Sequence, residues 1–398
     1  MREIYFKDFI TFQRGFDLPA NQRLSGEYPI VASASTNGFH SQYKVEPPGV
    51  VTGRSGTLGE VQYITKKFWP LNTSLWVKDF KGNFPKYVYY FLKLLDLKRF
   101  NSGAGVPTLN RNDLDTLKIS VHELKEQQKI ASILSAYDDL IENNTRRIQI
   151  LEEIARRIYE EWFVRFRFPR HENVKMVESE LGFIPEGWQI KTVMDFGKVV
   201  TGKTPSKSSP DNFGVDIPFL KLPDMHNNVF CINTSEKLSS KGANSQLSKF
   251  ILPNNLCVSC IGTVGIINIT SVKCQTNQQI NSILLDDLHN REFLYFALIG
   301  LRELMNQYGA NGATMVNLNK TKFERLPIMY PEQKHVENYH EVVFSLFQMI
   351  LNLQKKNDIL SQTRDLLLPK LISGEIDVSG FPEPKDLRKA QGKAHESK

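Results

Sequence analysis

The chain carries the same motifs in the same order twice, and the two copies lie 206 to 209 residues apart. Gly56-Thr57-Leu58-Gly59 returns as Gly262-Thr263-Val264-Gly265, an offset of 206, and Leu109-Asn110 returns as Leu318-Asn319, an offset of 209. Repeats of solenoids and propellers are much shorter, about 20–50 residues. The long period therefore indicates a duplicated domain together with its connecting element, and it predicts internal pseudo-two-fold symmetry.

Composition sets the broad class of the protein. A chain of 398 residues is long enough for two domains and a little more, each with its own core. No apolar run approaches the roughly 18 residues of a membrane span, and the first residues lack a signal-peptide core. The four cysteines all lie in the second copy, which is a poor disulfide framework and predicts a reducing cytoplasm. The net charge of +7 favours a polyanionic partner.

Each copy begins with short β-rich runs that are broken by Gly, Pro and Asn. Residues 49–52 and 60–64 are typical strands. An apolar stripe predicts a short helix over Pro85–Arg99, and a matching stripe follows at 293–301 in the second copy. We therefore expect two heads, each a mixed α+β domain.

A long helix is predicted after each head, because apolar residues recur there in alternating steps of four and three. The seam of the first helix consists of Ile130, Leu134, Tyr137, Ile141, Ile148, Leu151, Ala155, Ile158 and Trp162, with Asn144 in one polar slot. The equivalent positions of the second are Tyr339, Val343, Leu346, Ile350, Asn357, Leu360, Arg364, Leu367 and Leu371, with Leu353 opposite the Asn slot. A heptad seam sustained for more than four heptads is typical of a coiled coil.

The two polar slots predict a register. A two-fold axis relating the copies would run the helices antiparallel, so that Asn144 meets Asn357. In that register Ile148 meets Leu353, Leu134 meets Leu367 and Ile158 meets Val343. A buried Asn pair would hold the helices against sliding. The alternative is that each Asn is a half-exposed seam residue near solvent. Helices of about 40 residues would be about 60 Å long and would act as a stiff spacer.

Several motifs of catalytic proteins are absent from the sequence. The chain has no Gly-x-x-x-x-Gly-Lys-Ser/Thr phosphate loop and no Gly-x-Gly-x-x-Gly. It also lacks the Asn/Asp-Pro-Pro-aromatic motif with which methyltransferases hold a target amine, and a nuclease cluster of paired carboxylates with a lysine. We therefore expect no catalytic residues and no cofactor. Cys257 and Cys260 have a spacing seen in zinc sites. They lie in a predicted strand, however, where side chains alternate between faces, and we interpret them as small buried residues with no metal.

At this point the chain resembles the specificity subunit of type I restriction-modification systems over about residues 4–380. The residues that carry the resemblance are Ile184-Pro185-Glu186-Gly187-Trp188, the run Gly202-Lys203-Thr204-Pro205-Ser206-Lys207, the Glu-Gln pairs at 126–127 and 332–333, and Ser373-Gly374-Glu375-Ile376. The first copy departs from this pattern, since it lacks the Pro-Glu-Gly-Trp opening and starts at Ile4-Tyr5-Phe6.

The resemblance implies an α+β fold with two target-recognition domains joined by two long antiparallel coiled-coil helices. The domains would be 1–121 and 185–330, the central helices 122–167 and 331–373, the linker 168–184 and the tail 374–398, with disorder at 381–398. It implies a non-catalytic reader of a bipartite, asymmetric site on double-stranded DNA. Adenine-N6 methylation would come from two modification subunits on the central helices, and ATP-dependent cleavage from motor-nuclease subunits.

Lys, Arg and loop amides are the groups that contact phosphate, whereas amide and guanidinium side chains read base edges. Our predicted DNA contacts in the first head are Arg54, Ser55, Thr57, Lys66, Lys67, Arg99 and Arg111. Those in the second head are Lys203, Thr204, Ser206, Lys207, Lys221, Lys273, Gln278, Gln279 and Lys320. Arg54 would pair with guanine, and the two glutamines with adenine. Each could instead be a solvated surface side chain, and the glycines of the repeated motif fit turns better than phosphate contacts.

Two other functions remain open on the sequence alone. One is a structural scaffold that assembles other proteins without reading sequence, and the other is a stand-alone nuclease built from two copies. DNA binding that discriminates between sequences would exclude the scaffold. A purified chain that is inert with ATP, S-adenosylmethionine and DNA would exclude the nuclease.

Overall fold

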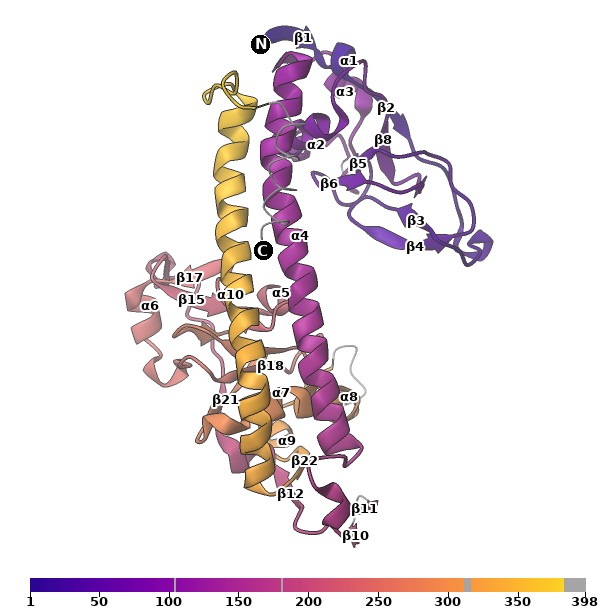
Figure 1. Ribbon diagram of the computed structural model, residues 1–398. Helices are drawn as coiled ribbons and strands as arrows, with labels where there is room; N and C mark the ends of the chain where they lie inside the picture. Colours follow the sequence, from indigo (N-terminus) through magenta and orange to yellow (C-terminus); the bar gives the residue numbers. More distant parts are fainter. Residues whose placement is uncertain (104, 180–181, 311–315, 383–398) are drawn as a thin grey trace. The chain divides into compact units, whose positions relative to one another are not determined.

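The computed structural model describes residues 1–103, 105–179, 182–310 and 316–382. It contains two compact units, of which unit 1 is Met1–Asp139 with Leu360–Lys398 and unit 2 is Leu140–Ile359. Figure 1 shows the elements of both units along the chain. The tail for which we predict disorder is 381–398, and its residues 383–398 lie outside the described ones.

Unit 1 contains three small sheets. The largest has the strand order β2-β8-β5-β6 and is antiparallel, the second has the order β4-β3-β7 with β3 and β7 parallel, and the third pairs β1 with β9. The bounds of these strands are β1 Arg2–Tyr5, β2 Thr11–Arg14, β3 Tyr28–Val31, β4 Thr36–His40, β5 Gly49–Gly53, β6 Val61–Ile64, β7 Trp69–Pro70, β8 Ser74–Asp79 and β9 Lys118–Val121.

Unit 2 contains a five-stranded sheet of order β13-β21-β18-β19-β16, a four-stranded sheet of order β14-β17-β15-β20, and the pairs β12-β22 and β10-β11. The bounds are β10 Met176–Ser179, β11 Gly182–Pro185, β12 Gln189–Thr192, β13 Gly197–Thr201, β14 Phe213–Gly214, β15 Ile217–Leu220, β16 Phe230–Cys231, β17 Glu236–Leu238, β18 Leu256–Ser259, β19 Ile267–Thr270, β20 Gln275–Thr276, β21 Ile280–Leu285 and β22 Pro327–Tyr330.

The duplication in the sequence is also a duplication of topology. The order β2-β8-β5-β6 returns as β13-β21-β18-β19, and β4-β3-β7 returns as β17-β15-β20 with the same parallel pair at its end. The pair β1-β9 returns as β12-β22. Each head combines helices with strands, so the predicted mixed α+β class is confirmed.

The short helices of the heads bury an apolar stripe against the sheets. In unit 1, α2 (Pro85–Leu94) buries Val88, Phe91 and Leu92. It ends at Leu94, five residues before the predicted end, because the Asp96 side chain accepts from the backbone N–H of Lys98 and begins a separate 3-10 turn. In unit 2, the predicted stripe lies on α7 (Arg291–Gly300). The remaining short helices are α1 Phe6–Phe9, α3 Arg111–Asp115, α5 Leu222–Met225, α6 Ser240–Asn244, α8 Arg302–Gly309 and α9 Lys320–Glu324.

Two long helices contribute residues to both units. Helix α4 is Leu124–Tyr159, continued by a π-helical turn at Glu160–Val164, and α10 is Gln333–Ile372. Their 36 and 40 residues correspond to about 54 and 60 Å at 1.5 Å per residue. Every residue of the predicted seam is buried or half-buried. No helix in the described part of the chain combines the length and the apolar character that a membrane crossing requires.

Within each unit the two long helices run antiparallel. In unit 2, Nδ2 of Asn144 donates to Oδ1 of Asn357 at 2.9 Å, and the Tyr339 hydroxyl donates to the carbonyl oxygen of Ala155 at 3.0 Å. In unit 1, Arg364 pairs with Asp138 at 2.6 Å. Leu134 and Leu367 share one apolar cluster, and Ile158 and Val343 share another, as the predicted register requires. That the Asn pair fixes this register stays a prediction.

The repeated Glu-Gln pair has a structural role at the start of each long helix. Gln127 is buried, and it donates to Asn83 at 2.7 Å and accepts from the backbone N–H of Phe84 at 2.8 Å, directly before α2. Gln333 donates to Asp287 at 2.9 Å, shortly before α7. Each Gln therefore ties a long helix to the segment before the short helix of its own head. The tie matters most at the buried Gln127, where an unsatisfied amide would cost about 1–3 kcal/mol, whereas Gln333 is exposed.

Candidate nucleic-acid interface

The Gly-Thr-x-Gly motif forms the same turn in both heads. Gly56 and Gly59 both have φ of +89°, and Gly262 and Gly265 have φ of +82° and +81°. The turn of the first head is held by a hydrogen bond from the N–H of Gly56 to Pro107, and that of the second by one from Gly262 to Val316. Side chains rarely adopt this left-handed backbone, so the glycines serve the turn. The turn presents whatever side chains flank it, and these differ between the heads.

In the first head, Arg54, Ser55 and Thr57 lie at this turn. Arg54 is half-buried and donates from Nη1 to the carbonyl oxygen of Asn72 at 3.2 Å. Ser55 forms a β-bridge with Thr108, and Thr57 is exposed. The structure therefore brings three of the predicted contacts together on one short segment.

The other predicted contacts of the first head have partners elsewhere or stand exposed. Lys67 donates to the Tyr43 hydroxyl at 3.0 Å and pairs with Glu46 at 3.0 Å. The hydrogen bond that Lys67 donates to Tyr43, followed by the one it donates to Glu46, raises the pKa of Lys67 above its ordinary value. The ammonium is thus charged but already engaged within the chain. Lys66, Arg99 and Arg111 are exposed, and Arg111 donates to the carbonyl oxygen of Phe12 at 3.2 Å.

In the second head, three loops converge. The hydroxyl of Thr204 donates to Oε1 of Gln278 at 2.7 Å, and the N–H of Lys203 donates to the carbonyl oxygen of Thr276 at 2.9 Å. Nε2 of Gln279 lies 3.9 Å from the position that a Cβ on Gly262 would occupy. The loop after β13, the loop after β18 and the turn before β21 therefore place Lys203, Thr204, Gln278 and Gln279 on one surface.

Gly202 allows this convergence. A Cβ at this position would lie 2.1 Å from the carbonyl oxygen of Asn277 and 2.2 Å from Oγ1 of Thr276. We expect Gly202→Ala to displace the turn at Asn277 and to cost about 1–3 kcal/mol of local stability, as overpacking does. Hydrogen exchange of peptides covering 275–285 should then be faster by about 5- to 150-fold.

The matched control for this change is Gly300→Ala. Its Cβ meets nothing within 4 Å, and alanine is favoured over glycine in a helix by about 1 kcal/mol. Unchanged exchange in Gly202→Ala would show that the loops do not depend on this close approach.

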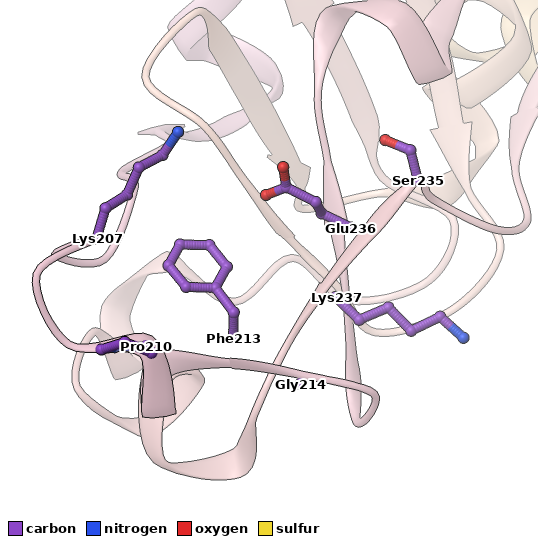
Figure 2. A pocket seen from close by; sticks show the side chains of 7 residues that line it. All are labelled: Lys207, Pro210, Phe213, Gly214, Ser235, Glu236 and Lys237. Carbon is purple, nitrogen blue, oxygen red and sulfur yellow. The ribbon is translucent and has the colours of Figure 1, made fainter. Parts of the chain in front are cut away.

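Lys207 lines a neighbouring feature, an open pocket of about 530 Å³, and Ser206 directly precedes it in the chain. Ser206 is hydrogen-bonded to Ser208 at 2.7 Å. Figure 2 shows the side chains of Lys207 and Glu236 on either side of the Phe213 ring. Lys221 is only 21% exposed in its side chain and forms an ion pair with Glu236. This predicted contact is therefore neutralised by the carboxylate.

The two remaining predicted contacts, Lys273 and Lys320, are exposed at separate places. Nζ of Lys273 lies 4.0 Å from the centre of the Phe250 ring, and Lys320 pairs with Glu324 at 3.4 Å within α9. No hydrogen bond or ion pair among the described residues ties either lysine to the converging loops. Lys273 keeps an exposed cation for a polyanion, whereas the charge of Lys320 is partly offset by Glu324.

The cysteines are core residues in the part of the chain that the structure describes. All four are buried and free. Cys257 packs with Cys231 and Cys274 in one apolar cluster, whereas Cys260 packs in another. Burial raises the pKa of the Cys257 and Cys260 thiols to about 12 each. No group of three or more potential metal ligands occurs among the described side chains.

Sequence reasoning missed Asn277, Phe213 and Lys237. Asn277 is 8% exposed, and its side chain binds Gln279 twice, accepting from the backbone N–H of Gln279 and donating to its side-chain Oε1. An Asn two residues before a Gln, directly after a short strand, is a signal for such an Asx turn. Phe213 and Lys237 line the pocket from two paired strands, β14 and β17, whose pairing the sequence does not reveal.

Comparison with known proteins places these observations in a family. Residues 3–153 and 185–361 match the family model described as type I restriction modification DNA specificity domain. The chain is 33% identical over 327 residues to the type I restriction enzyme HindI specificity subunit of Haemophilus influenzae, covering 68% of this chain and 71% of the relative. It is 29% identical to the MjaIX specificity subunit of Methanocaldococcus jannaschii, covering 78% and 74%.

A solved structure is similar in fold. It is the type I restriction-modification S subunit from M. genitalium, with a TM-score of 0.59 and 16% sequence identity, covering 95% of this chain and 96% of that chain. At this identity the similarity concerns the fold alone.

Proposed function

The chain belongs to the family of type I restriction-modification DNA specificity proteins, and on this premise we propose that it selects the DNA target for catalytic partner subunits. It would bind a bipartite, asymmetric site and direct adenine-N6 methylation or ATP-dependent cleavage there, without performing either reaction itself. The resemblance recognised in the sequence is confirmed by the family match over both copies.

One observation carries the proposal of two different half-sites. Both heads build the same glycine turn on the same strands, but the side chains around it differ. Arg54 in the first head has Cys260 as its counterpart, and Asn72 has Gln278. The two heads share the backbone of the turn but carry different side chains around it. They would therefore read different base edges, because each base pair presents its own pattern of donors and acceptors in the major groove.

The charges of the loops support binding to the DNA backbone. The exposed Lys66, Arg99, Lys203, Lys207 and Lys273 are cations at or near the loops of the two heads. Such contacts supply affinity that does not depend on sequence and falls with salt, whereas the amide and guanidinium groups supply discrimination. The net charge of +7 agrees with this division.

We propose further that the long helices carry the partners. Two modification subunits would dock on α4 and α10, which would form a coiled coil with the Asn144–Asn357 pair as its register element. Motor-nuclease subunits would complete the complex. Exposed apolar side chains on these helices support a protein partner there. Ile150 and Ile154 are four residues apart and so neighbours on one face of α4, and contiguous apolar patches mark interaction surfaces.

The test is a selection from a pool of random duplex DNA at about 150 mM salt, with the chain assembled with its methyltransferase partner. We expect enrichment of one motif made of two separated half-sites, with specific binding at least about 10³-fold tighter than non-specific binding. A scaffold would retain DNA equally from all sequences, and a pool that emerges unenriched would contradict the proposal. A chain that cleaves DNA alone would indicate a nuclease.

A further inference from the structure

The turn Asn277–Gln279 of the second head lies between β20 and β21, and backbone hydrogen bonds hold its conformation. The N–H of Asn277 donates to Leu220 at 3.2 Å, and the carbonyl oxygen of Gln279 accepts from the N–H of Cys260 at 2.7 Å. The carbonyl oxygen of Asn277 accepts from Ile280 at 3.2 Å. The turn is therefore held by the sheet on one side and by the strand end before the Gly-Thr-x-Gly turn on the other.

Within this turn the orientation of one amide is determined by a backbone group. The N–H of Gln279 can only donate, and it donates to Oδ1 of Asn277 at 3.1 Å. Oδ1 is thereby assigned, so the other atom of that amide is the donor Nδ2, which bonds Oε1 of Gln279 at 3.0 Å. It follows that Oε1 of Gln279 is the acceptor of this pair and that Nε2 is its outer atom.

Nε2 of Gln279 is placed at the surface where the loops converge. Its side chain is half-buried, and Nε2 lies beside Gly262, which has no side chain to cover it. For this amide nitrogen no hydrogen-bond acceptor is recorded among the described residues. Gln278 next to it is anchored through Thr204. The turn thus presents one oriented N–H₂ donor.

We propose that Gln279 reads a hydrogen-bond acceptor on one base of the half-site bound by the second head. Asn277 is the positioning residue, because it fixes which atom of the Gln279 amide, the donor Nε2 or the acceptor Oε1, faces outward. The inference rests on the proposed function. In the major groove guanine offers O6 and N7 and thymine offers O4, whereas cytosine offers the N4 amino donor and adenine carries its N6 amino group beside N7. A donor that faces outward therefore finds no acceptor on cytosine, and it favours guanine or thymine over adenine, whose N7 acceptor stands beside an amino donor.

This assignment differs from the pairing with adenine that the sequence suggests. A bidentate contact with adenine uses the oxygen and the nitrogen of the amide together. Oε1 of Gln279 already accepts from Asn277, so only Nε2 is directed outward. The equivalent positions of the first head are Leu71 and Thr73, which cannot build this pair. The device belongs to one half-site only.

Two substitutions should reverse the polarity by different routes. In Asn277→Asp the new carboxylate accepts from both the N–H and the Nε2 of Gln279, which turns the amide over and leaves Oε1 outermost. In Gln279→Glu the contact with Asn277 persists, and a carboxylate oxygen replaces Nε2. Both variants should change the preference at one and the same position from guanine or thymine to cytosine or adenine, by about 5- to 150-fold.

The measurement is the selection from random duplex DNA with the chain assembled with its methyltransferase partner. Gln189→Glu is the matched control, because Gln189 is exposed on β12 of the same unit and the change of charge is identical. It should leave the motif unchanged. The half-site of the first head should stay unchanged in all variants, which reports that the first head and the complex are intact, and retention of the other positions of the second half-site reports that unit 2 folds.

The outcomes separate the inference from the proposed function. If the unsubstituted complex enriches no motif, the proposed function fails. If it enriches a motif that both variants leave unchanged, or that they change at different positions or without reversal, Gln279 does not read a base in this way. Should Asn277→Asp lose the second half-site altogether, Gln279→Glu decides alone, since it retains the hydrogen bond from Asn277.

Discussion

Removal of this chain from a cell that retains an active partner methyltransferase is expected to abolish N6-methyladenine at one motif with two separated half-sites. The expectation follows from the division of labour that we propose, in which the partner supplies the chemistry and this chain supplies the sequence preference. Loss should be complete rather than partial, because discrimination of about 4–10 kcal/mol between specific and non-specific DNA disappears with the chain.

Long-read sequencing of the genome, with and without the gene, measures this effect. Restoring the chain should restore the same motif, and restoring it with Gly300→Ala should do so equally. Methylation that persists unchanged in cells with demonstrated methyltransferase activity would contradict the role and would leave the scaffold as the better explanation.

Glu292→Ala is expected to destabilise unit 2 by about 3–5 kcal/mol, the cost of leaving a buried charge without its partner. Glu292 is fully buried, and Arg291 is 3% exposed. Nε of Arg291 donates to Oε1 of Glu292 at 2.9 Å, and Nδ1 of His340 lies 2.7 Å from Oε2. Without the carboxylate, the buried guanidinium of Arg291 between α7 and α10 has lost its ion-pair partner, and Asn254 is its remaining hydrogen-bond partner.

Hydrogen exchange of peptides from α7 measures this loss of stability locally. The measurement is therefore valid even if the whole chain does not unfold in one step. Exchange should accelerate by roughly two to three and a half orders of magnitude. Glu292→Gln is the matched control, since it retains the shape and one acceptor, and it should cost less. The double change Arg291→Met with Glu292→Leu should recover much of the stability, because it removes both charges. Exchange in Glu292→Ala that stays within tenfold of the original would refute the importance of the network.

Much of the fold could be predicted because the signals are local and periodic. The heptad seam predicts two long helices, and the structure contains them at Leu124–Tyr159 and Gln333–Ile372. The repeated Gly-Thr-x-Gly predicts two equivalent turns, and all four glycines have positive φ. The predicted end of α2 was wrong. The apolar stripe continues, but the backbone N–H of Lys98 donates to the Asp96 side chain and a separate turn begins there.

The predicted DNA contacts stay a prediction, and the sequence could not specify their geometry. Lys67 and Lys221 read as free cations in the sequence, and both are paired with a glutamate of their own head. Asn277 was overlooked because its position after a short strand signals at most an Asx turn and does not show which neighbouring side chain the turn orients. Its role depends on the orientation of a neighbouring amide, which only the folded turn defines.

The sequence by itself determined that the protein has two homologous heads, two long helices and no familiar catalytic motif. The heads and the helices could be predicted because a repeat and an apolar period are visible along the chain, and they determine local structure through short-range interactions. Only the tertiary structure decided which polar groups meet. Thr204 and Gln278 are 74 residues apart, and Glu292 and His340 are 48 apart. Such contacts arise from sheet pairing and helix packing, so the pattern along the chain cannot reveal them.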